Sequence, residues 1–208
     1  EGKTAVVTGA GAGIGRAIAR AFAMEGAGVI VAEKNPESGQ RVATELANLG
    51  PPGQFVPLDV TDMDSVRAAL QGVLEREGCI DILVNNAYPT MAYAPSHIHA
   101  LAEDRLRTSM NAGFFAAVAA MQLVFPAMRR GGYGRVINLC SLNGVNAHKY
   151  TADYNSAKEA LRAYTRTAAA EWARYGITAN VICPGAATTP YQALADFNPG
   201  MAEDLKKT

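Results

Sequence analysis

A glycine-rich turn near the start of the chain constrains the fold more than any other feature. Residues 4–8 form a β-branched and apolar run that leads directly into the turn, and residues 16–25 then show a helical pattern that Gly26 ends. The turn has the spacing G-x-x-x-G-x-G, with Gly9, Gly13 and Gly15. A strand, a glycine turn and a helix in this order are typical of nucleotide-binding units, because the backbone can approach a pyrophosphate at the helix N-terminus. An ordinary tight loop would also use glycines, so this interpretation depends on the rest of the chain.

The remaining sequence alternates short apolar runs with helical patterns. The five further strands are expected at residues 28–32, 54–58, 80–84, 134–140 and 178–183. Alternation of this kind predicts an α/β fold with a doubly wound parallel sheet of the Rossmann type, in three layers and one domain over residues 1–208. Ligand groups are then expected at the carboxyl ends of the strands. Residues 186–208 lose the pattern and are predicted to form a loop with a short helix that covers the substrate.

Charge and composition narrow the choice of partners. The chain of 208 residues has 19 basic and 19 acidic side chains and no long run of either sign, which argues against nucleic acid and favours a small molecule. The longest apolar run, Ala112–Met121, is shorter than the roughly 18 residues that span a bilayer, so no membrane association is expected.

Three widely spaced cysteines predict reduced thiols in a cytoplasmic protein. His97 and His99 lack further ligands nearby, and no metal is predicted.

Two acids follow predicted strands where a nucleotide would lie. Glu33 ends the second strand and could accept hydrogen bonds from both hydroxyls of an adenosine ribose while repelling a 2′-phosphate, which favours NAD. Lys34 could instead pair with a 2′-phosphate, so NADP stays an alternative. Asp59, with the Val60 backbone, could meet the adenine, although a turn cap is an equal interpretation of Asp59.

Tyr154 and Lys158 are four residues apart in an Ala-rich segment predicted to be helical, so both side chains lie on one face. A free phenol titrates at about pH 10, and a neighbouring ammonium lowers that pKa toward the range in which a proton donor or acceptor works best. Chance could supply such a pair, so its interpretation also depends on other motifs.

Taken together, these motifs resemble those of the short-chain dehydrogenase/reductase family. The similarity spans essentially the whole chain and is carried, in order, by Thr8-Gly9-x-x-x-Gly13-x-Gly15, Asp59, Asn85-Asn86-Ala87, Asn111, Ser141, Tyr154-x-x-x-Lys158 and Pro184-Gly185-x-x-x-Thr189. Ser141 precedes Tyr154 by 154 − 141 = 13 residues, the interval usual in that family.

The resemblance implies an NAD(H)-dependent oxidoreductase that moves hydride between the cofactor and a secondary alcohol or ketone. Tyr154 would be the general acid/base, Lys158 would lower its pKa and bind the nicotinamide ribose, Ser141 would orient the substrate oxygen, and Asn111 would hold a relay water. The implied cofactor contacts are Gly9, Gly13, Ile14, Gly15, Glu33, Asp59, Val60, Asn86, Ala87, Tyr154, Lys158, Pro184, Gly185, Ala187 and Thr189. The implied substrate pocket is lined by Ser141, Asn143, His148, Tyr154, Tyr88 and Tyr191.

The sequence departs from the family pattern in two places. Tyr88 follows Asn-Asn-Ala where the family usually has glycine, which predicts a bulkier, aromatic wall near the nicotinamide. Family members commonly add a helix and a strand after the position of Thr208, so the end of the family fold is expected to be absent. The family also suggests a homo-oligomer, a tetramer or a dimer, with helices around Phe114 and Tyr164 at the interfaces.

Other functions stay open at this point. A nicotinamide-dependent epimerase or dehydratase and a non-catalytic nucleotide-binding homologue would share the motifs. A hydrolase using Ser141 and His148 is disfavoured, because Leu139-Cys140-Ser141-Leu142-Asn143 is no G-x-S-x-G elbow.

Overall fold

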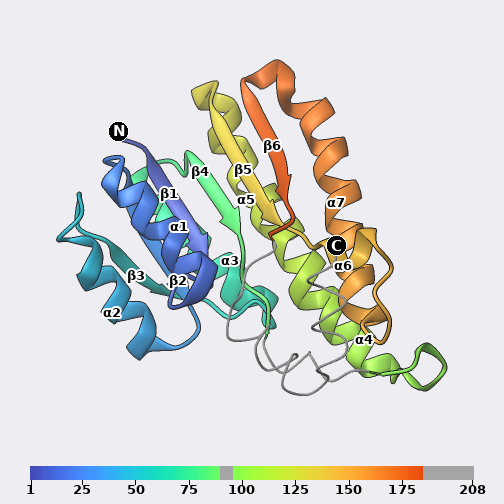
Figure 1. The fold of residues 1–208 in the computed structure, drawn as a ribbon. Helices are drawn as coiled ribbons and strands as arrows, with labels where there is room; N and C mark the ends of the chain where they lie inside the picture. Colours follow the sequence, from blue (N-terminus) through green and yellow to red (C-terminus); the bar gives the residue numbers. More distant parts are fainter. Residues whose placement is uncertain (90–95, 185–208) are drawn as a thin grey trace.

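The computed structural model describes residues 1–89 and 96–184. Within them the chain alternates strands and helices as predicted (Figure 1). The elements are β1 (Thr4–Thr8), α1 (Gly13–Met24), β2 (Gly28–Glu33), α2 (Pro36–Leu46), β3 (Gln54–Pro57), α3 (Met63–Glu77), β4 (Ile82–Asn85), η2 (Ile98–Ala100), α4 (Glu103–Met110), η3 (Asn111–Phe115), α5 (Ala116–Gly131), β5 (Gly134–Leu139), α6 (Leu142–Val145), α7 (Ala152–Trp172), η4 (Ala173–Tyr175) and β6 (Ile177–Ile182).

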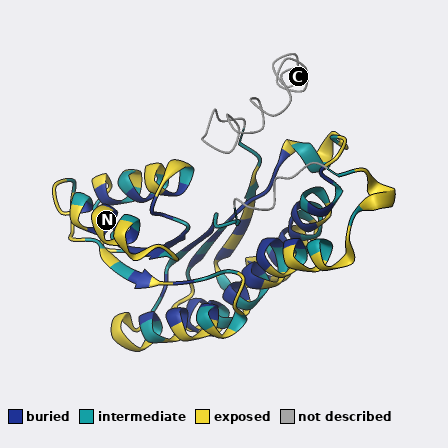
Figure 2. Cartoon of the chain, turned by 90° about the horizontal axis from the view of Figure 1, so that it is seen from below, coloured by how far each residue is buried: buried dark blue, intermediate teal, exposed yellow. Residues whose placement is uncertain are grey.

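The six strands form one parallel sheet in the order β3-β2-β1-β4-β5-β6. Helices α1 and α2 cover one face of this sheet, and α3, α5 and α7 pack on the other (Figures 1 and 2). The doubly wound, three-layered α/β fold predicted from the sequence is therefore confirmed. The order reverses between β1 and β4, so the connections that leave these two strands run to opposite faces of the sheet, which leaves a crevice at their carboxyl ends.

Local signals in the sequence account for most element boundaries. The Asn35 side chain accepts from the Ser38 N–H at the start of α2, and the Asp62 side chain caps α3 in the same way. Gly78, at φ 75°, ends α3 in the left-handed conformation that favours glycine. Five of the predicted strands differ from the observed ones by one or two residues. The fourth is Ile82–Asn85 rather than 80–84, and the sixth is Ile177–Ile182 rather than 178–183. The second ends at Glu33 rather than at 32, the third at Pro57 rather than at 58, and the fifth at Leu139 rather than at Cys140.

The long helix after residue 102 is continuous from Glu103 to Gly131 but is not uniform. Asn111–Phe115 forms a π-helical segment between α4 and α5, which the apolar pattern did not predict. By length and composition alone these 29 residues would suffice to cross a membrane, a test that core helices also pass. Here Met121 and Val124 are fully buried in the core cluster shared with α3 and the sheet, which identifies a core helix.

A chain of hydrogen bonds between polar side chains runs through the core below the crevice. The Asn85 amide of β4 donates to Asn138 Oδ1 on β5 at 2.8 Å, and Asn138 Nδ2 donates to Thr165 Oγ1 on α7 at 2.8 Å. Asn138 is fully buried. Because an unpaired polar group costs free energy in such surroundings, this chain fixes α7 relative to the two central strands.

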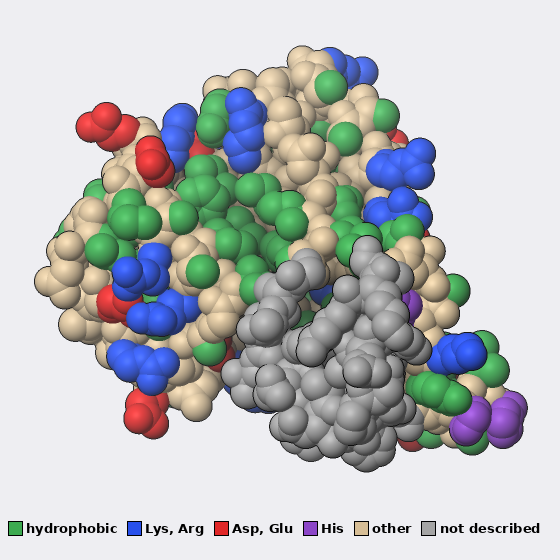
Figure 3. Space-filling view, viewed as in Figure 1, with side chains coloured by type: hydrophobic (Ala, Val, Ile, Leu, Met, Phe, Trp, Pro, Cys, Tyr) green, Lys and Arg blue, Asp and Glu red, His purple; other side chains and the backbone are tan. Residues whose placement is uncertain are grey.

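The face that carries α1 and α2 also has an apolar area. Figure 3 shows hydrophobic side chains gathered across its centre, flanked by basic and acidic residues. Ile82 and Ile137 are half-buried here on β4 and β5. By strand alternation the exposed Ile182 of β6 lies on the same face.

Candidate active site

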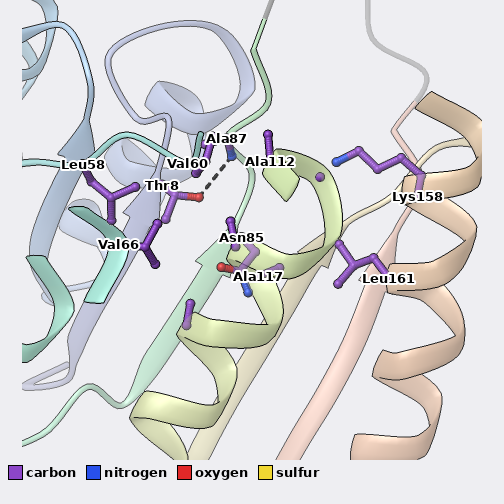
Figure 4. Close-up of a pocket in the computed structure, with 13 residues that line it drawn as sticks. Thr8, Leu58, Val60, Val66, Asn85, Ala87, Ala112, Ala117, Lys158 and Leu161 are labelled. Carbon is purple, nitrogen blue, oxygen red and sulfur yellow. Dashed lines mark hydrogen bonds between the residues drawn. The ribbon is translucent and has the colours of Figure 1, made fainter. Parts of the chain in front are cut away.

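The crevice at the point where the strand order reverses contains a narrow pocket (Figure 4). Its walls come from the carboxyl ends of β1 and β4, from the π segment with α5, and from α7. The lining residues are Thr8, Leu58, Val60, Val66, Asn85, Ala87, Ala112, Gly113, Ala116, Ala117, Ala120, Lys158 and Leu161. Ligands of doubly wound sheets bind at this position, so the pocket lies where the sequence predicted ligand groups.

The glycine turn leaves open space in front of helix α1. Gly9 and Gly13 have positive φ angles of 66° and 52°. A Cβ atom at Gly9 would lie 2.9 Å from the Ala87 Cα, and one at Gly15 would clash with the Gly9 carbonyl oxygen, whereas one at Gly13 would meet nothing within 4 Å. Helix α1 has no side-chain cap. Its first N–H groups, Ile14 included, therefore suit a pyrophosphate, and the chain fits a dinucleotide cofactor here.

Thr8 and Asn86 bind the glycine turn to the end of β4. The Thr8 hydroxyl donates to the Val84 carbonyl and accepts from the N–H groups of Asn86 and Ala87, each at 3.0 Å. The Asn86 amide donates to the carbonyls of Thr8 and Gly9. Asn86, predicted to line the cofactor, therefore has a side chain engaged in holding the turn.

The two acids predicted near the adenosine both form contacts within the chain. The Glu33 carboxylate accepts from the N–H groups of Gly11 and Asn35, each at 3.0 Å. Asp59 pairs with the Lys34 ammonium at 2.7 Å and accepts from Thr61, which agrees with the turn-cap interpretation. Burial would raise the pKa of Asp59, but the hydrogen bonds from Lys34 and Thr61 outweigh it and lower the pKa.

Tyr154 and Lys158 lie on one face of α7, as the spacing predicted. The Lys158 ammonium is 5.8 Å from the centroid of the Tyr154 ring and donates to the Leu139 carbonyl at 2.7 Å. Lys158 is only 3% exposed. Burial lowers its pKa from the ordinary 10.5 to about 8, because the charged form loses hydration.

Ser141, Asn143 and His148 belong to the segment between β5 and α7. The Ser141 side chain caps α6 by accepting from the Asn143 N–H at 3.1 Å. The Asn143 carbonyl accepts from the His148 N–H, and the His148 carbonyl accepts from the hydroxyl of Thr151 at the start of α7. The three predicted substrate residues thus lie on one hydrogen-bonded segment that enters the catalytic helix.

Two predicted residues have surroundings that the sequence did not indicate. Asn111 is exposed at the start of the π segment. The ring of Tyr88, expected as a pocket wall, is half-buried between Gly113 of the π segment and Tyr154 of α7. The Tyr88 hydroxyl donates to buried Ser109, and burial raises the Tyr88 pKa to about 12. The predicted positions Gly185, Ala187, Thr189 and Tyr191 lie outside the described residues, whereas Pro184 is the last residue before them.

Sequence reasoning missed the buried Asp153, which accepts from Ser109 and from the Arg105 guanidinium. An acid in the first turn of a helix is ordinarily a solvated partner of the helix dipole, so no pattern marked it as buried. The only available signal was its position directly before Tyr154.

The fold, the glycine turn and the position of the pocket define a dinucleotide-binding enzyme. Comparison with known proteins then identifies the family: the chain matches the family model of the short chain dehydrogenases over residues 3–198. The chain belongs to the short-chain dehydrogenase family, and it is an NAD(P)-dependent oxidoreductase.

Three characterised proteins illustrate the similarity. A sorbitol dehydrogenase of Cereibacter sphaeroides is 38% identical over 186 residues, which are 89% of this chain and 70% of the relative. The structure of an NAD+-bound xylitol dehydrogenase is 29% identical with a TM-score of 0.85, covering 93% of this chain and 75% of that one. A gluconate 5-dehydrogenase from Burkholderia cenocepacia, solved with NADP and tartrate, is 34% identical with a TM-score of 0.86, covering 94% and 76%.

Burial of the Lys158 ammonium predicts that this side chain lowers the stability of the fold. The ammonium is charged at pH 7 in the folded and unfolded chain, and a lowered folded pKa means that its burial is unfavourable. Lys158→Met is therefore expected to raise the free energy of unfolding at pH 7 by about 1–3 kcal/mol, the upper value matching the size of the pKa shift. Between pH 8 and 10.5 the unfolded state binds more protons, so the stability of the native chain should rise and the advantage of the variant should shrink.

Urea unfolding across this pH range provides the measurement. Lys149→Met removes an exposed ammonium instead and should change the stability little at any pH. If Lys158→Met proved clearly less stable than the native chain at pH 7, the buried ammonium would be a stabilising group and the argument would be wrong.

Proposed function

We propose that this enzyme transfers hydride between NAD(H) and a secondary alcohol or ketone, with Tyr154 as the general acid/base. The observation that carries the proposal is the Tyr154–Lys158 pair on α7, whose buried ammonium lines the pocket at the carboxyl ends of β1 and β4. Two of the similar structures contain NAD+ or NADP, and the similar enzymes are named for polyols or gluconate, which supports an alcohol substrate.

The chemistry follows from what each side chain can do. Bound NAD would supply the hydride acceptor for the substrate carbon. The Tyr154 phenolate takes the hydroxyl proton during oxidation and returns it during reduction. The Lys158 ammonium favours the phenolate by its charge, and the Ser141 hydroxyl donates to the substrate oxygen as negative charge develops. Asn111, at the exposed start of the π segment, is proposed to hold the water that connects Lys158 to solvent.

The proposal assigns the cofactor contacts by position. The open space at Gly13 holds the pyrophosphate, with Gly9, Gly15 and Ile14 around it. Glu33 meets the adenosine ribose, while Asp59 with Val60 lies beside the adenine. The nicotinamide end of the cofactor is assigned to the remaining predicted contacts, which are Ala87, Pro184, Gly185, Ala187 and Thr189. The substrate pocket is assigned to Ser141, Asn143, His148, Tyr154 and Tyr191.

Replacing Tyr154 tests the mechanism directly. Tyr154→Phe removes the ionisable oxygen and should lower kcat by about 10²–10⁴-fold, the usual contribution of general acid–base catalysis, while NADH binding changes little. Cofactor absorbance during oxidation of a panel of secondary alcohols measures kcat, and nicotinamide fluorescence measures binding.

Tyr150→Phe is the matched control, because Tyr150 is an exposed tyrosine of the neighbouring segment. Full turnover by Tyr154→Phe would contradict the proposal. Product formation without net cofactor reduction would favour an epimerase or dehydratase, and tight cofactor binding without any turnover would favour a non-catalytic homologue.

Glu33 predicts that NAD is preferred over NADP. Its carboxylate is held at the end of β2 by the N–H groups of Gly11 and Asn35, so a 2′-phosphate would meet a fixed negative charge. Glu33→Gln should shift the ratio of kcat/KM for NAD to that for NADP toward NADP by about tenfold, which corresponds to roughly 1.4 kcal/mol.

The comparison uses Glu37→Gln, an exposed acid in the first turn of α2 that should leave the ratio unchanged. A native preference for NADP would contradict the assignment. It would favour the alternative in which Lys34, whose side chain is 68% exposed, leaves Asp59 to pair with the 2′-phosphate.

We also propose that the chain forms a homo-oligomer through the aromatic surface of the π segment and α7. Phe114 packs against Phe115 at 5.0 Å and against Tyr164 at 5.9 Å between ring centroids, and Phe115 is 48% exposed. Burying these rings against a second copy would remove apolar area from water. Phe115→Glu should therefore yield a smaller species in light scattering.

Met24→Glu on α1 is the control, since Met24 is also an exposed apolar residue but lies away from this surface. A native chain that is monomeric at micromolar concentration would refute the oligomer.

A further inference from the structure

Tyr88 contacts Tyr154 and Lys158, two of the residues to which the proposed chemistry is assigned. Its ring meets that of Tyr154 edge to face, with centroids 4.9 Å apart and an interplanar angle of 87°. The Lys158 ammonium is 5.3 Å from the Tyr88 ring centroid, a shorter distance than the 5.8 Å to the Tyr154 ring. The ammonium therefore has two aromatic rings within cation–π range, and one of them comes from the segment after β4 rather than from the catalytic helix.

The hydroxyl of Tyr88 is anchored on two other elements. It donates to Ser109 Oγ at 2.9 Å, and the Ser109 hydroxyl donates in turn to Asp153 Oδ2 at 3.2 Å. Arg105 Nε donates to the same carboxylate oxygen at 2.8 Å. Ser109 is fully buried and Asp153 is 1% exposed. Because Asp153 directly precedes Tyr154, the hydrogen-bond chain ends on the turn of α7 that carries the proposed acid/base.

The backbone of the π segment makes room for the Tyr88 ring. A Cβ atom at Gly113 would lie 2.9 Å from Tyr88 Cε2 and 3.0 Å from the Ala157 Cβ on α7. Any side chain at position 113 would therefore displace the ring or the helix. The ring fills a space that exists because residue 113 is glycine.

We propose that Tyr88 is a positioning residue that keeps Lys158 charged and fixes the ring of Tyr154. This inference rests on the proposed function and extends it to a residue outside the Ser141, Tyr154 and Lys158 set. An aromatic face stabilises the ammonium in a site where water is excluded, and edge-to-face packing restricts rotation of the Tyr154 ring.

The other groups around Lys158 show why a ring is needed. The Leu139 carbonyl accepts its hydrogen bond, and Cys140 and Cys183 interact with it from the ends of β5 and β6. Burial raises the pKa of both thiols, so they are neutral at working pH and offer no negative charge. Burial meanwhile lowers the pKa of Lys158 to about 8. Stabilisation of the ammonium by the rings and the carbonyl therefore opposes loss of its proton.

Separating the ring from the hydroxyl tests the proposal. Tyr88→Phe keeps both ring contacts, whereas Tyr88→Leu removes them and still fills much of the space. In Tyr88→Leu, a smaller fraction of Lys158 should carry its proton than in the native chain, and the Tyr154 pKa should therefore be higher. The pH midpoint at which alcohol oxidation rises should move by about half a unit or more toward alkaline pH, and kcat at pH 7 should fall about threefold or more.

A readout without turnover uses the near-ultraviolet absorbance of tyrosinate. The difference between titrations with and without Tyr154→Phe reports ionisation of Tyr154, both in the native chain and in the Tyr88→Leu background. This midpoint should shift in the same direction in Tyr88→Leu, and by less than about 0.2 units in Tyr88→Phe. Tyr133→Leu is the matched control, because the Tyr133 ring also faces cations, Lys3 and Arg135, but precedes β5 at the opposite end of the sheet.

Unchanged or acid-shifted midpoints in folded Tyr88→Leu would overturn the proposal, while inactive native enzyme or fully active Tyr154→Phe would instead overturn the proposed function. If Tyr88→Leu does not fold, Gly113→Ala gives the test, because its methyl group displaces the Tyr88 ring. Ala157→Gly is added to this variant, and serves alone as its reference, because the same methyl group would otherwise meet the Ala157 Cβ on α7. The double variant should shift the Tyr154 midpoint toward alkaline pH. The same alkaline shift of the Tyr154 midpoint is expected when position 88 is Phe, because the Phe ring fills the same space. If the midpoint does not shift with either Tyr or Phe at position 88, the ring does not have the proposed role.

Discussion

The hydroxyl of Thr8 is the contact on which the rest of the site depends. It joins the end of β1 to the end of β4 at the point where the sheet order reverses, and the Asn86 amide joins the same strands from the other side. These bonds continue the pairing of β1 and β4 beyond the last backbone partners, Val7 and Val84. The glycine turn and the residue after Ala87 both start from this junction. The proposed cofactor cradle and the Tyr88 ring are thereby placed by one set of hydrogen bonds.

Burial of charge is the second constraint on this molecule. Lys158 and Asp153 lie on the same helix and are both almost fully buried. The cost of burying the charge is compensated differently for each side chain. Asp153 has a cation, the Arg105 guanidinium, at hydrogen-bond distance. Lys158 has a backbone carbonyl and aromatic faces in place of an anion. A carboxylate beside Lys158 would stabilise the ammonium further but would also compete with the phenolate that the proposed chemistry requires.

Much of the fold could be predicted from the sequence, because strand and helix periods, caps and glycines are local signals. Asn35 and Asp62 are residue types that favour the N-cap position, and both start helices here. The Tyr154–Lys158 spacing alone correctly predicted a shared helix face. The surroundings of Tyr88 could not be predicted. Its ring direction depends on the absence of a side chain at Gly113, which is 25 residues away in the sequence and meets Tyr88 only in the folded chain. Contacts of this kind produce no periodic pattern in the sequence that could be detected.

The same difficulty applies to Glu33 and Asp59, where the sequence indicated acids at strand ends but not their partners within the chain. Both carboxylates accept hydrogen bonds from backbone N–H groups, Glu33 from Gly11 and Asn35 and Asp59 from Thr61. The bond between Gly11 and Glu33 joins residues that are 22 apart in the sequence, so no local pattern could predict it.

The π segment at Asn111–Phe115 sets an angle between the site and the core. One residue corresponds to roughly 100° of rotation in an α-helix, and a π turn contains one residue more than an α turn. Arg105 and Ser109 therefore face Asp153 while the apolar residues of α5 still face the sheet. A single-residue deletion in this segment that spared Asn111 and Gly113 would keep the residues of the proposed chemistry in the chain and yet turn α4 away from α7. An insertion or deletion in this helix would thus change the site by rotating α4 about the helix axis, without replacing any side chain.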